Sequence, residues 1–452
     1  MSIKQLTLAN LKAAKRSAKA VPDQLRVVAA HVGWRFHGHA PLLPLGEAVA
    51  AMARPFPSSA AIPVRVVTPA QGHFMTTFFD VEAFSPSGRY LAVTQVPFID
   101  RIPIPGDVAR VCVIDLEADT CIAVHETRGW GAQLGANVQW GTDDETLFCN
   151  DVKDGRGVGV VIDRSSGEAR FLDGPIYGVT PDRKTSFSPD LLLVNRIIPG
   201  YGVADPLLGK RRQADVASAN EGIWQTNLDT GECQLFMSLA DIVKDLPEQT
   251  GLGKGRYHVF NVKVNRQGTR LFAVLFSRNV PMRGGTPTQL VTMNIDGSNV
   301  QLAMPDRLWR RGGHHPSWTA DGDHIMMNLR LDGKRMEFVR FRYDGADIEV
   351  LAPGHKGSGH PSLIPSDETY LLTDSYVSEG FKEPDGTVPI RLIDLRNGVE
   401  DAICRVDTRG LDGPRRIDPH PVWERSGHRL AFNAYVDGHR QVLVADTSSL
   451  IS

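Results

Sequence analysis

A phrase repeated near the C-terminus constrains the fold of this chain more than any other feature. The chain reads GGHHPSWTADGDHIMMN from Gly312, GSGHPSLIPSDETYLLTD from Gly357 and RIDPHPVWERSGHRLAFN from Arg416. Each copy holds a His-Pro pair, an apolar residue two positions after the proline, a polar turn and a largely apolar run. Self-similarity with a period of roughly 40 to 50 residues is typical of the blades of a β-propeller.

The same pattern continues upstream without the His-Pro pair, in residues 80–94, 138–148 and 262–272. Each of these segments reads as a strand, a tight turn and a second strand rich in β-branched and aromatic residues. A third strand follows in each repeat, and it ends in a short, largely apolar run with a polar residue at the turn. These endings occur seven times, at residues 113–116, 161–164, 226–229, 293–296, 341–344, 392–395 and 444–447. The sequence therefore predicts an all-β protein, a seven-bladed β-propeller.

The predicted propeller covers residues 63–452, after a short helical or irregular N-terminal extension in residues 1–62 that packs on it. An open last sheet would leave an unpaired edge, so the ring is expected to be closed. Residues 64–67 can supply the outer strand of the last blade, residues 416–449. We therefore expect both ends of the propeller to meet in one sheet.

Composition excludes several classes of partner. The formal net charge is -2, which gives no signal for nucleic-acid binding. No apolar run approaches the roughly 18 residues that span a bilayer, and the N-terminal segment lacks the apolar core of an export signal. The five cysteines show no Cys-x-x-Cys spacing and read as buried thiols. We expect a cytoplasmic protein without a membrane partner; its oligomeric state is left open.

Three histidines of the repeated phrase hold the same phase. His315, His360 and His420 each stand directly before a proline. Equivalent positions of neighbouring blades converge on one axis, and imidazoles gathered in this way can bind a divalent metal ion, with Mn, Zn and Ca left open. His314, beside His315, leaves the choice of ligand open. In the alternative, each histidine is merely hydrogen-bonded within its own blade.

A second set of polar residues lies near the ends of predicted inner or second strands. His73 precedes the first inner strand, where an imidazole can act as a general acid or base. Cations and amides on the same face suit an acidic sugar, because they neutralise or bind its carboxylate. The candidates for this role are Gln139, Arg156, Arg278 and His258, with Tyr201 as a proton-transfer group. The alternative for each of these residues is a solvated position on the rim, without a role in binding.

Several strings resemble known propeller enzymes that act on uronate-containing glycans. They are GHFMTTFFD from Gly72, FSPSGRYL from Phe84, PGYG from Pro199, DPHPVW from Asp418 and GHRQ from Gly438. The resemblance is to the oligogalacturonate, ulvan and rhamnose-glucuronate lyases, together with the related propeller α-L-rhamnosidases. It covers most of the chain from about His73 onward.

The resemblance implies an enzyme that abstracts the proton α to a uronate carboxylate and eliminates the 4-O-glycosidic bond. Arg or a metal neutralises the carboxylate in these enzymes. By position, His73 resembles their first catalytic histidine, and the place of the second falls near Gln95. His315, His360 and His420 resemble their metal-binding histidines.

Three functions stay open from the sequence. In the first, a lyase cleaves an acidic oligosaccharide, with His73 as acid or base, Tyr201 as proton donor, and Arg156 or Arg278 as carboxylate neutraliser. The second is hydrolysis, because a single rim histidine resembles the rhamnosidase branch. The third is a binding propeller whose partner-binding loops are residues 199–220 and 381–388. New ultraviolet absorbance from an unsaturated product would distinguish elimination from the other two.

Overall fold

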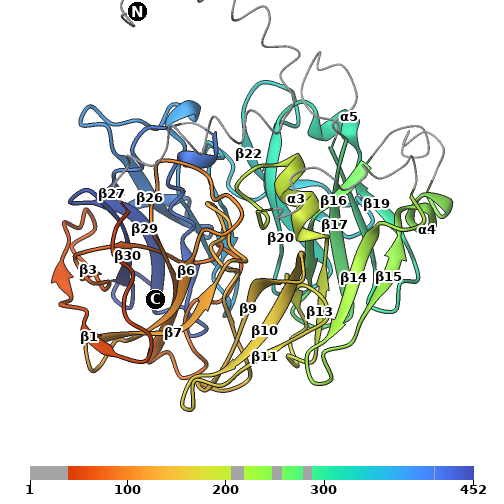
Figure 1. Cartoon of the computed structure of the whole chain (residues 1–452). Coiled ribbons are helices and arrows are strands. Elements are labelled where there is room, and N and C mark those ends of the chain that lie inside the picture. Colours follow the sequence, from red (N-terminus) through yellow and green to blue (C-terminus); the bar gives the residue numbers. More distant parts are fainter. Residues whose placement is uncertain (1–38, 205–217, 247–256, 278–287, 412, 452) are drawn as a thin grey trace, which may run out of the picture. The chain divides into compact units, whose positions relative to one another are not determined.

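The computed structural model describes residues 39–204, 218–246, 257–277, 288–411 and 413–451. The larger of two compact units, Ala40–Pro206 with Gln213–Ser452, contains seven antiparallel sheets of four or five strands each. Successive sheets follow one another along the chain as the blades of a propeller (Figure 1). The predicted seven-bladed β-propeller is thus confirmed.

The strands of the first four blades follow one another from the inner strand outward. Blade 1 consists of β4 (His73–Met75), β5 (Tyr90–Val96), β6 (Ala109–Asp115), β7 (Thr120–Thr127) and β1 (Ala48–Ala50). Blade 2 consists of β8 (Gln139–Trp140), β9 (Thr146–Lys153), β10 (Arg156–Asp163) and β11 (Ala169–Phe171). Blade 3 consists of β12 (Gly178–Val179), β13 (Thr185–Ser188), β14 (Gly222–Asn227) and β15 (Cys233–Ser238). Blade 4 consists of β16 (Tyr257–Val264), β17 (Arg270–Ser277), β18 (Thr288–Asn294) and β19 (Gln301–Met304).

The last three blades carry the repeated His-Pro phrase. Blade 5 consists of β20 (Gly313–Trp318), β21 (His324–Leu329), β22 (Glu337–Arg342) and β23 (Glu349–Val350). Blade 6 consists of β24 (Ser362–Leu363), β25 (Tyr370–Thr373), β26 (Val388–Asp394) and β27 (Val399–Val406). Blade 7 consists of β28 (Val422–Trp423), β29 (Arg429–Val436), β30 (His439–Asp446), β3 (Val64–Val66) and β2 (Arg54–Pro55).

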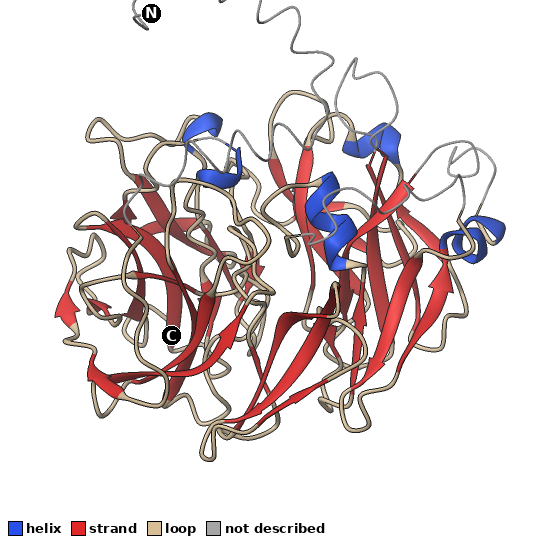
Figure 2. Ribbon diagram, viewed as in Figure 1, coloured by secondary structure: helices blue, strands red, loops and turns tan. Residues whose placement is uncertain are grey.

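Short helices lie between strands (Figure 2). They are α3 (Leu191–Ile197), α4 (Leu239–Lys244), α5 (Asp306–Trp309) and the 3-10 turns η5 (Val377–Glu379) and η6 (Gly413–Arg415). Asp190 caps α3 by accepting hydrogen bonds from two backbone N–H groups of its first turn. Among the described helices, none is long and apolar enough to cross a membrane.

The ring closes as the sequence predicts. Strand β3 pairs with β30, placing Val64 opposite Ala445 and Val66 opposite Leu443. Strands β1 and β2 precede residue 62 and add the outermost strands of blades 1 and 7. Part of the predicted extension therefore joins the sheets, while residues 1–38 lie outside the described residues and the boundary at residue 62 stays a prediction.

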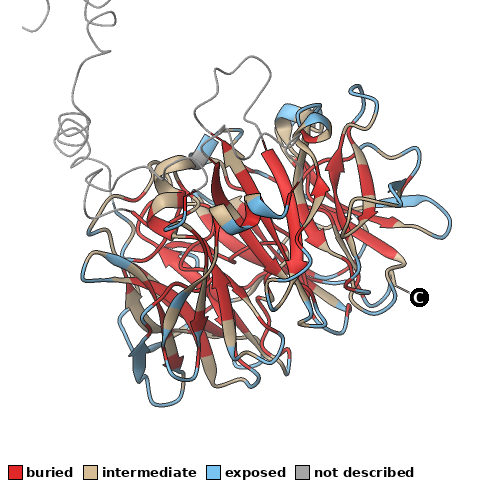
Figure 3. Ribbon diagram, turned by 90° about the vertical axis from the view of Figure 1, so that its right-hand side faces the viewer, coloured by how far each residue is buried: buried red, intermediate tan, exposed pale blue. Residues whose placement is uncertain are grey.

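Apolar side chains fill the space between neighbouring blades. Between blades 4 and 5, for example, Phe272 and Val274 pack with Ile325 and Met327, all of them buried. Buried residues follow the strands and exposed ones gather at the turns (Figure 3). Burying one such side chain contributes about 1.5–3 kcal/mol, so the blades are held together chiefly by this apolar packing.

A polar residue near the end of the second strand binds the inner segment of the following blade. We call these residues the latch residues: Thr94, Asn150, Asn328, Asp374 and Asn433. Thr94 accepts a hydrogen bond from the backbone N–H of Ala136 at 3.0 Å, and Asn433 accepts one from Thr76 at 2.9 Å. The latch residues thus satisfy backbone groups that no strand partner reaches.

Candidate metal centre

Three imidazoles meet where blades 5, 6 and 7 adjoin. His315 belongs to β20, His360 directly precedes the Pro361 that leads into β24, and His420 stands two residues before β28. The ring centroids of His315 and His360 are 3.8 Å apart, and those of His360 and His420 are 4.3 Å apart. The sequence phase of the His-Pro pairs therefore brings the three side chains together as expected.

The backbone at two of these histidines is unusual. His315 has a φ of 58° and His420 a φ of 46°, in the left-handed region that residues with a Cβ rarely adopt. Such a conformation costs on the order of 1–3 kcal/mol and persists only where the surroundings fix it. The strain is located at the side chains that converge, which is typical of a functional site.

A buried carboxylate orients His360. The Nδ1 atom of His360 lies 3.0 Å from both carboxylate oxygens of Asp374, and its backbone N–H donates to Oδ1 at 2.6 Å. Burial alone would raise the pKa of Asp374, but the charge and hydrogen bonds of His360 lower it below its usual value. Because an ionised carboxylate only accepts, Nδ1 of His360 carries the proton that faces Asp374, and Nε2 is the nitrogen whose lone pair a metal ion would use.

The same argument applies to His315. Its Nδ1 atom lies 2.6 Å from the backbone carbonyl oxygen of Gly359, which can only accept. The proton is therefore on Nδ1, and Nε2 of His315 also keeps a lone pair. Burial lowers the pKa of His315 well below its ordinary value, so the ring is neutral, as a metal ligand must be.

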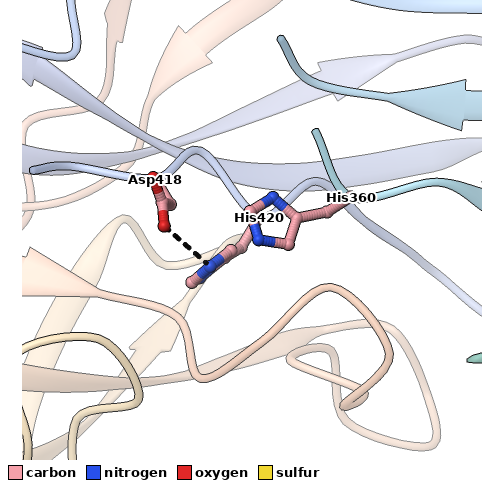
Figure 4. A group of neighbouring side chains, drawn as sticks. All are labelled: His360, Asp418 and His420. Carbon is pink, nitrogen blue, oxygen red and sulfur yellow. Dashed lines mark ion pairs between the residues drawn. The ribbon is translucent and has the colours of Figure 1, made fainter. Parts of the chain in front are cut away.

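His420 and Asp418 complete the donor group (Figure 4). His420 is fully buried, and neither of its ring nitrogens has a hydrogen-bond partner among the described residues. Its Nε2 lies 3.7 Å from Oδ2 of Asp418. One ligand atom from each of His360, Asp418 and His420 lies within 4.8 Å of the other two. Buried polar atoms without partners are costly, and a bound ion would satisfy them.

The donor chemistry limits which ion fits. Imidazole nitrogens with one carboxylate oxygen suit ions such as Mn, Fe or Zn, whereas Ca is bound by oxygen ligands. The structure thus modifies the predicted trio. His360 and His420 belong to the tight donor group, Asp418 supplies its third member, and His315 stacks on His360 beside it. The role of His315 as a ligand stays a prediction.

Two aromatic rings pack against the imidazoles. The ring centroid of Phe78 lies 4.6 Å from that of His420, and the centroid of Phe79 lies 5.3 Å from that of His360. Both phenylalanines are buried. This apolar contact lowers the local polarity and strengthens electrostatic interactions at the candidate centre.

A cavity of about 380 Å³ opens beside the candidate centre. Its wall includes His314, His315, Tyr376, Glu379, Arg416 and Asp418. The hydroxyl group of Tyr376 lies 3.3 Å from Nε2 of His360, and burial raises the pKa of Tyr376 well above its ordinary value. Tyr376 therefore keeps its proton at neutral pH and can donate it.

Arg416 links the cavity to a residue that the sequence singled out. Its Nε donates to Oδ1 of Asp418 at 2.8 Å, and its Nη2 donates to the hydroxyl oxygen of Tyr201 at 2.7 Å. Burial raises the pKa of Tyr201 above its ordinary value. The structure thus brings Tyr201 next to the candidate centre, held there through Arg416.

An imidazole–carboxylate pair lies on the same wall. Nε2 of His314 is 3.0 Å from Oε1 of Glu379, and Nδ1 of His314 is 3.2 Å from the side-chain nitrogen of Asn328. Because Asn328 donates through its amide, Nδ1 accepts and Nε2 carries the proton toward Glu379. This pair is an arrangement that can hold and transfer a proton.

His73 is not on the rim, which corrects the sequence prediction. Its side chain is 9% exposed, and its Nδ1 accepts a hydrogen bond from the backbone N–H of Arg440 at 3.2 Å. Burial lowers its pKa to about 4, with the charges of His439, Arg409 and Arg440 acting in the same direction. The inner strand β4 lies against blade 7, so the imidazole is packed between elements instead of facing solvent.

Gln95 also has a structural place, so its assignment to the catalytic group is corrected. The side chain is fully buried; its amide nitrogen donates to the carbonyl of Pro41, and its oxygen accepts from the backbone N–H of Leu43. Gln139 is buried as well and donates to the carbonyl of Tyr177 at 2.7 Å. Both amides hold backbone in place, and neither lines the cavity beside the candidate centre.

The other predicted substrate-binding residues are scattered. Arg156 is exposed at the start of β10 and donates to the carbonyl of Asp173 at 3.0 Å. His258 is only 4% exposed within β16, which corrects its placement on an accessible rim. Arg278 lies outside the described residues. The structure places neither Arg156 nor His258 on the wall of the cavity beside the candidate centre.

Sequence reasoning missed Asp374, Asp418 and Arg416. A signal for the first was present, since Asp374 ends its copy of the repeated phrase where Asn328 and Asn433 end theirs. Asp418 stands two residues before His420 in the string DPHP, a spacing that brings both side chains to one segment. Both carboxylates belong to copies of the repeated phrase that also hold a His-Pro pair.

Comparisons with protein families and with curated proteins found no match. Solved structures do match. An oligogalacturonate lyase in complex with manganese has a TM-score of 0.64 and 15% identity, over 89% of this chain and 98% of that one. An oligogalacturonate lyase from Vibrio parahaemolyticus has a TM-score of 0.62 and 14% identity, over 90% of this chain and 100% of that one. At such identities the likeness shows a shared fold.

Proposed function

We propose that this protein is a lyase that cleaves a uronate-containing oligosaccharide by β-elimination with a divalent metal ion. The observation that carries the proposal is the buried donor group of His360, Asp418 and His420 beside a cavity that also exposes Arg416. The fold shared with two oligogalacturonate lyases, one of them solved with manganese, supports this choice of chemistry.

The ion would be held by Nε2 of His360, a nitrogen of His420 and the carboxylate of Asp418, with His315 available as a further ligand. When bound, it would act as a Lewis acid on the uronate carboxylate. Asp374 keeps His360 in the required tautomer through its bonds to Nδ1. This is the outer carboxylate that metal-ligating histidines commonly have.

Arg416 supplies the fixed positive charge. Elimination requires a neutralised carboxylate, because otherwise the carbanion at C5 forms beside a negative charge. The guanidinium lines the cavity and is held on two sides by Asp418 and Tyr201. Tyr201, which the sequence suggested as a proton donor, thus acts as a positioning residue for Arg416.

Two cavity residues divide the proton transfers. The carboxylate of Glu379, to which Nε2 of His314 donates, accepts the C5 proton, and the electron pair of that C–H bond forms the C4=C5 double bond. The C4–O bond breaks, and the leaving oxygen takes a proton from Tyr376, whose raised pKa keeps it protonated until then. The sugar is released as an unsaturated uronate and a shortened chain.

An ultraviolet assay tests the proposal. Mn²⁺-loaded protein is incubated with oligogalacturonate and with rhamnosyl-glucuronate, and the His420→Ala variant serves as the control. Absorbance of the new double bond with wild type and not with the variant is expected. Free sugar without new absorbance would mean hydrolysis. If several uronates give neither free sugar nor absorbance, the protein is a non-catalytic binding propeller. Either outcome contradicts the proposed lyase activity. The burial of His73 removes the observation on which hydrolysis rested.

A further inference from the structure

A second cavity, of about 350 Å³, adjoins the cavity beside the candidate centre. Ser378 and Glu379 line both cavities, so the two share one wall. The second cavity is lined by four cationic side chains, which we call the basic groove: Arg330, Lys334, Arg335 and Lys356. A molecule bound at the candidate centre can therefore extend past η5 into a region of positive charge.

The charges of the basic groove are not neutralised by ion pairs with described acids. Sixteen arginines elsewhere in the described chain form ion pairs with Asp or Glu. None of the four cations of the basic groove forms an ion pair within the described ranges. Cations that the chain leaves unpaired in one hollow are available to an anionic ligand.

The nearby acids do not cancel this charge. Glu379, which lines the groove, is engaged by His314 and by the hydroxyl group of Ser358. Asp332 accepts hydrogen bonds from the backbone N–H groups of Lys334 and Arg335 at 2.8 and 3.2 Å, so its carboxylate caps the turn. The groove therefore keeps an excess of positive charge.

Parts of the groove are held in place. Lys356 donates to the backbone carbonyl of Glu379, and its ammonium lies 5.3 Å from the ring centroid of Phe381. Arg330 is half-buried, and its buried Nε has no hydrogen-bond partner in the part of the chain that the structure describes. Gly312, with a φ of 119°, lies against the Arg330 side chain, where an added Cβ would be 3.0 Å from its Cδ. Arg330 therefore contributes a fixed positive charge at the wall of the groove, which attracts a carboxylate ligand.

We propose that the basic groove binds further uronate units of an oligosaccharide whose cleaved bond lies at the candidate centre. The inference rests on the proposed function and adds a substrate class to it: polyuronates longer than a disaccharide. Each additional uronate brings one carboxylate, which can pair with a cation of the basic groove; Lys334 and Arg335 are exposed there. Chain length, and not only the sugar at the cleaved bond, then determines how well a substrate binds.

Kinetics on chains of different length test this inference. The double variant Lys334→Gln/Arg335→Gln is compared with wild type on di- and tetragalacturonate. The matched control, Lys184→Gln/Lys244→Gln, removes two exposed charges from blade 3 and α4. We expect the groove variant to lower kcat/KM on the tetrasaccharide about tenfold more than on the disaccharide, mainly through KM. The control should lower neither, and added salt should reduce the preference for the longer chain.

If the groove variant lowers kcat/KM equally on both oligosaccharides, or on neither, the inference that the groove binds further uronate units is wrong. If neither oligosaccharide is cleaved, the proposed lyase activity is wrong. Titration calorimetry then tests separately whether the groove binds the oligosaccharide. Tetragalacturonate should still bind to wild type and to the Lys184→Gln/Lys244→Gln control and bind about tenfold more weakly to the groove variant. Equal binding to wild type and groove variant, or none to wild type, contradicts the inference.

Discussion

The buried carboxylate of Asp374 accepts hydrogen bonds from both the ring and the backbone of His360. It also accepts one from the backbone N–H of His420 at 3.3 Å. As a latch residue, Asp374 connects blade 6 to blade 7, and this connection fixes the imidazoles of the candidate centre. One side chain thus serves both the joining of blades and the orientation of a ligand.

Asp374→Asn should therefore weaken metal binding. An amide can donate to His360 and so allow the wrong tautomer, and the loss of such an outer partner typically costs roughly 10–100-fold in metal affinity. Titration calorimetry with Mn²⁺ or Zn²⁺ measures the change. The control is Asn150→Asp, a latch residue of blade 2, which should lose stability and keep its metal affinity. An Asp374→Asn variant with unchanged affinity would remove this carboxylate from the account.

Arg416→Gln should lower kcat/KM by roughly 10²- to 10³-fold, the loss seen when one fixed donor to a developing anion is removed. Tyr201→Phe should lower it by a smaller factor, because Arg416 keeps its bonds to Asp418. Steady-state kinetics on an oligogalacturonate provide the measurement. Arg415→Gln, an exposed neighbour, is the matched control. A fall caused equally by Arg415→Gln would point to general charge and not to Arg416.

His73 should make stability depend on pH. Its pKa is about 4 in the folded protein and near 6.5 when unfolded, so the unfolded chain binds more protons between these values. The free energy of unfolding therefore falls as pH decreases from 6.5 toward 4, by up to roughly 3 kcal/mol from this residue. Urea unfolding at several pH values measures the slope, which should be smaller in His73→Gln and unchanged in the exposed-site control His428→Gln. Equal slopes in His73→Gln and wild type would show that His73 is not buried as described.

The repeat determined the fold because its period and turns are local signals that each blade carries. Ring closure followed from the same argument, and β3 pairs with β30 as expected. The phase of His315, His360 and His420 also predicted their meeting, since equivalent positions in neighbouring blades share an axis. The fold, the ring closure and the convergence of the three histidines all follow from the spacing of residues, which can be read from the sequence.

The sequence does not show how deeply a polar side chain is buried. Nothing local distinguishes an imidazole on the rim from one that β4 packs beneath His439 and Arg440, and so His73 was assigned to the wrong environment. Gln95 was misplaced for the same reason, because its partners Pro41 and Leu43 lie far away in the chain. Contacts between remote segments decide whether a polar side chain binds backbone or ligand.

Metal analysis of the purified, metal-loaded and dialysed protein tests the central claim most directly. Wild type should retain about one divalent transition-metal ion per chain, as expected for a single site. His420→Ala should retain almost none, and His428→Gln should retain as much as wild type. Wild-type protein that retains no ion, or a His420→Ala variant that retains a full equivalent, would contradict the assignment of His360, Asp418 and His420 as a metal centre.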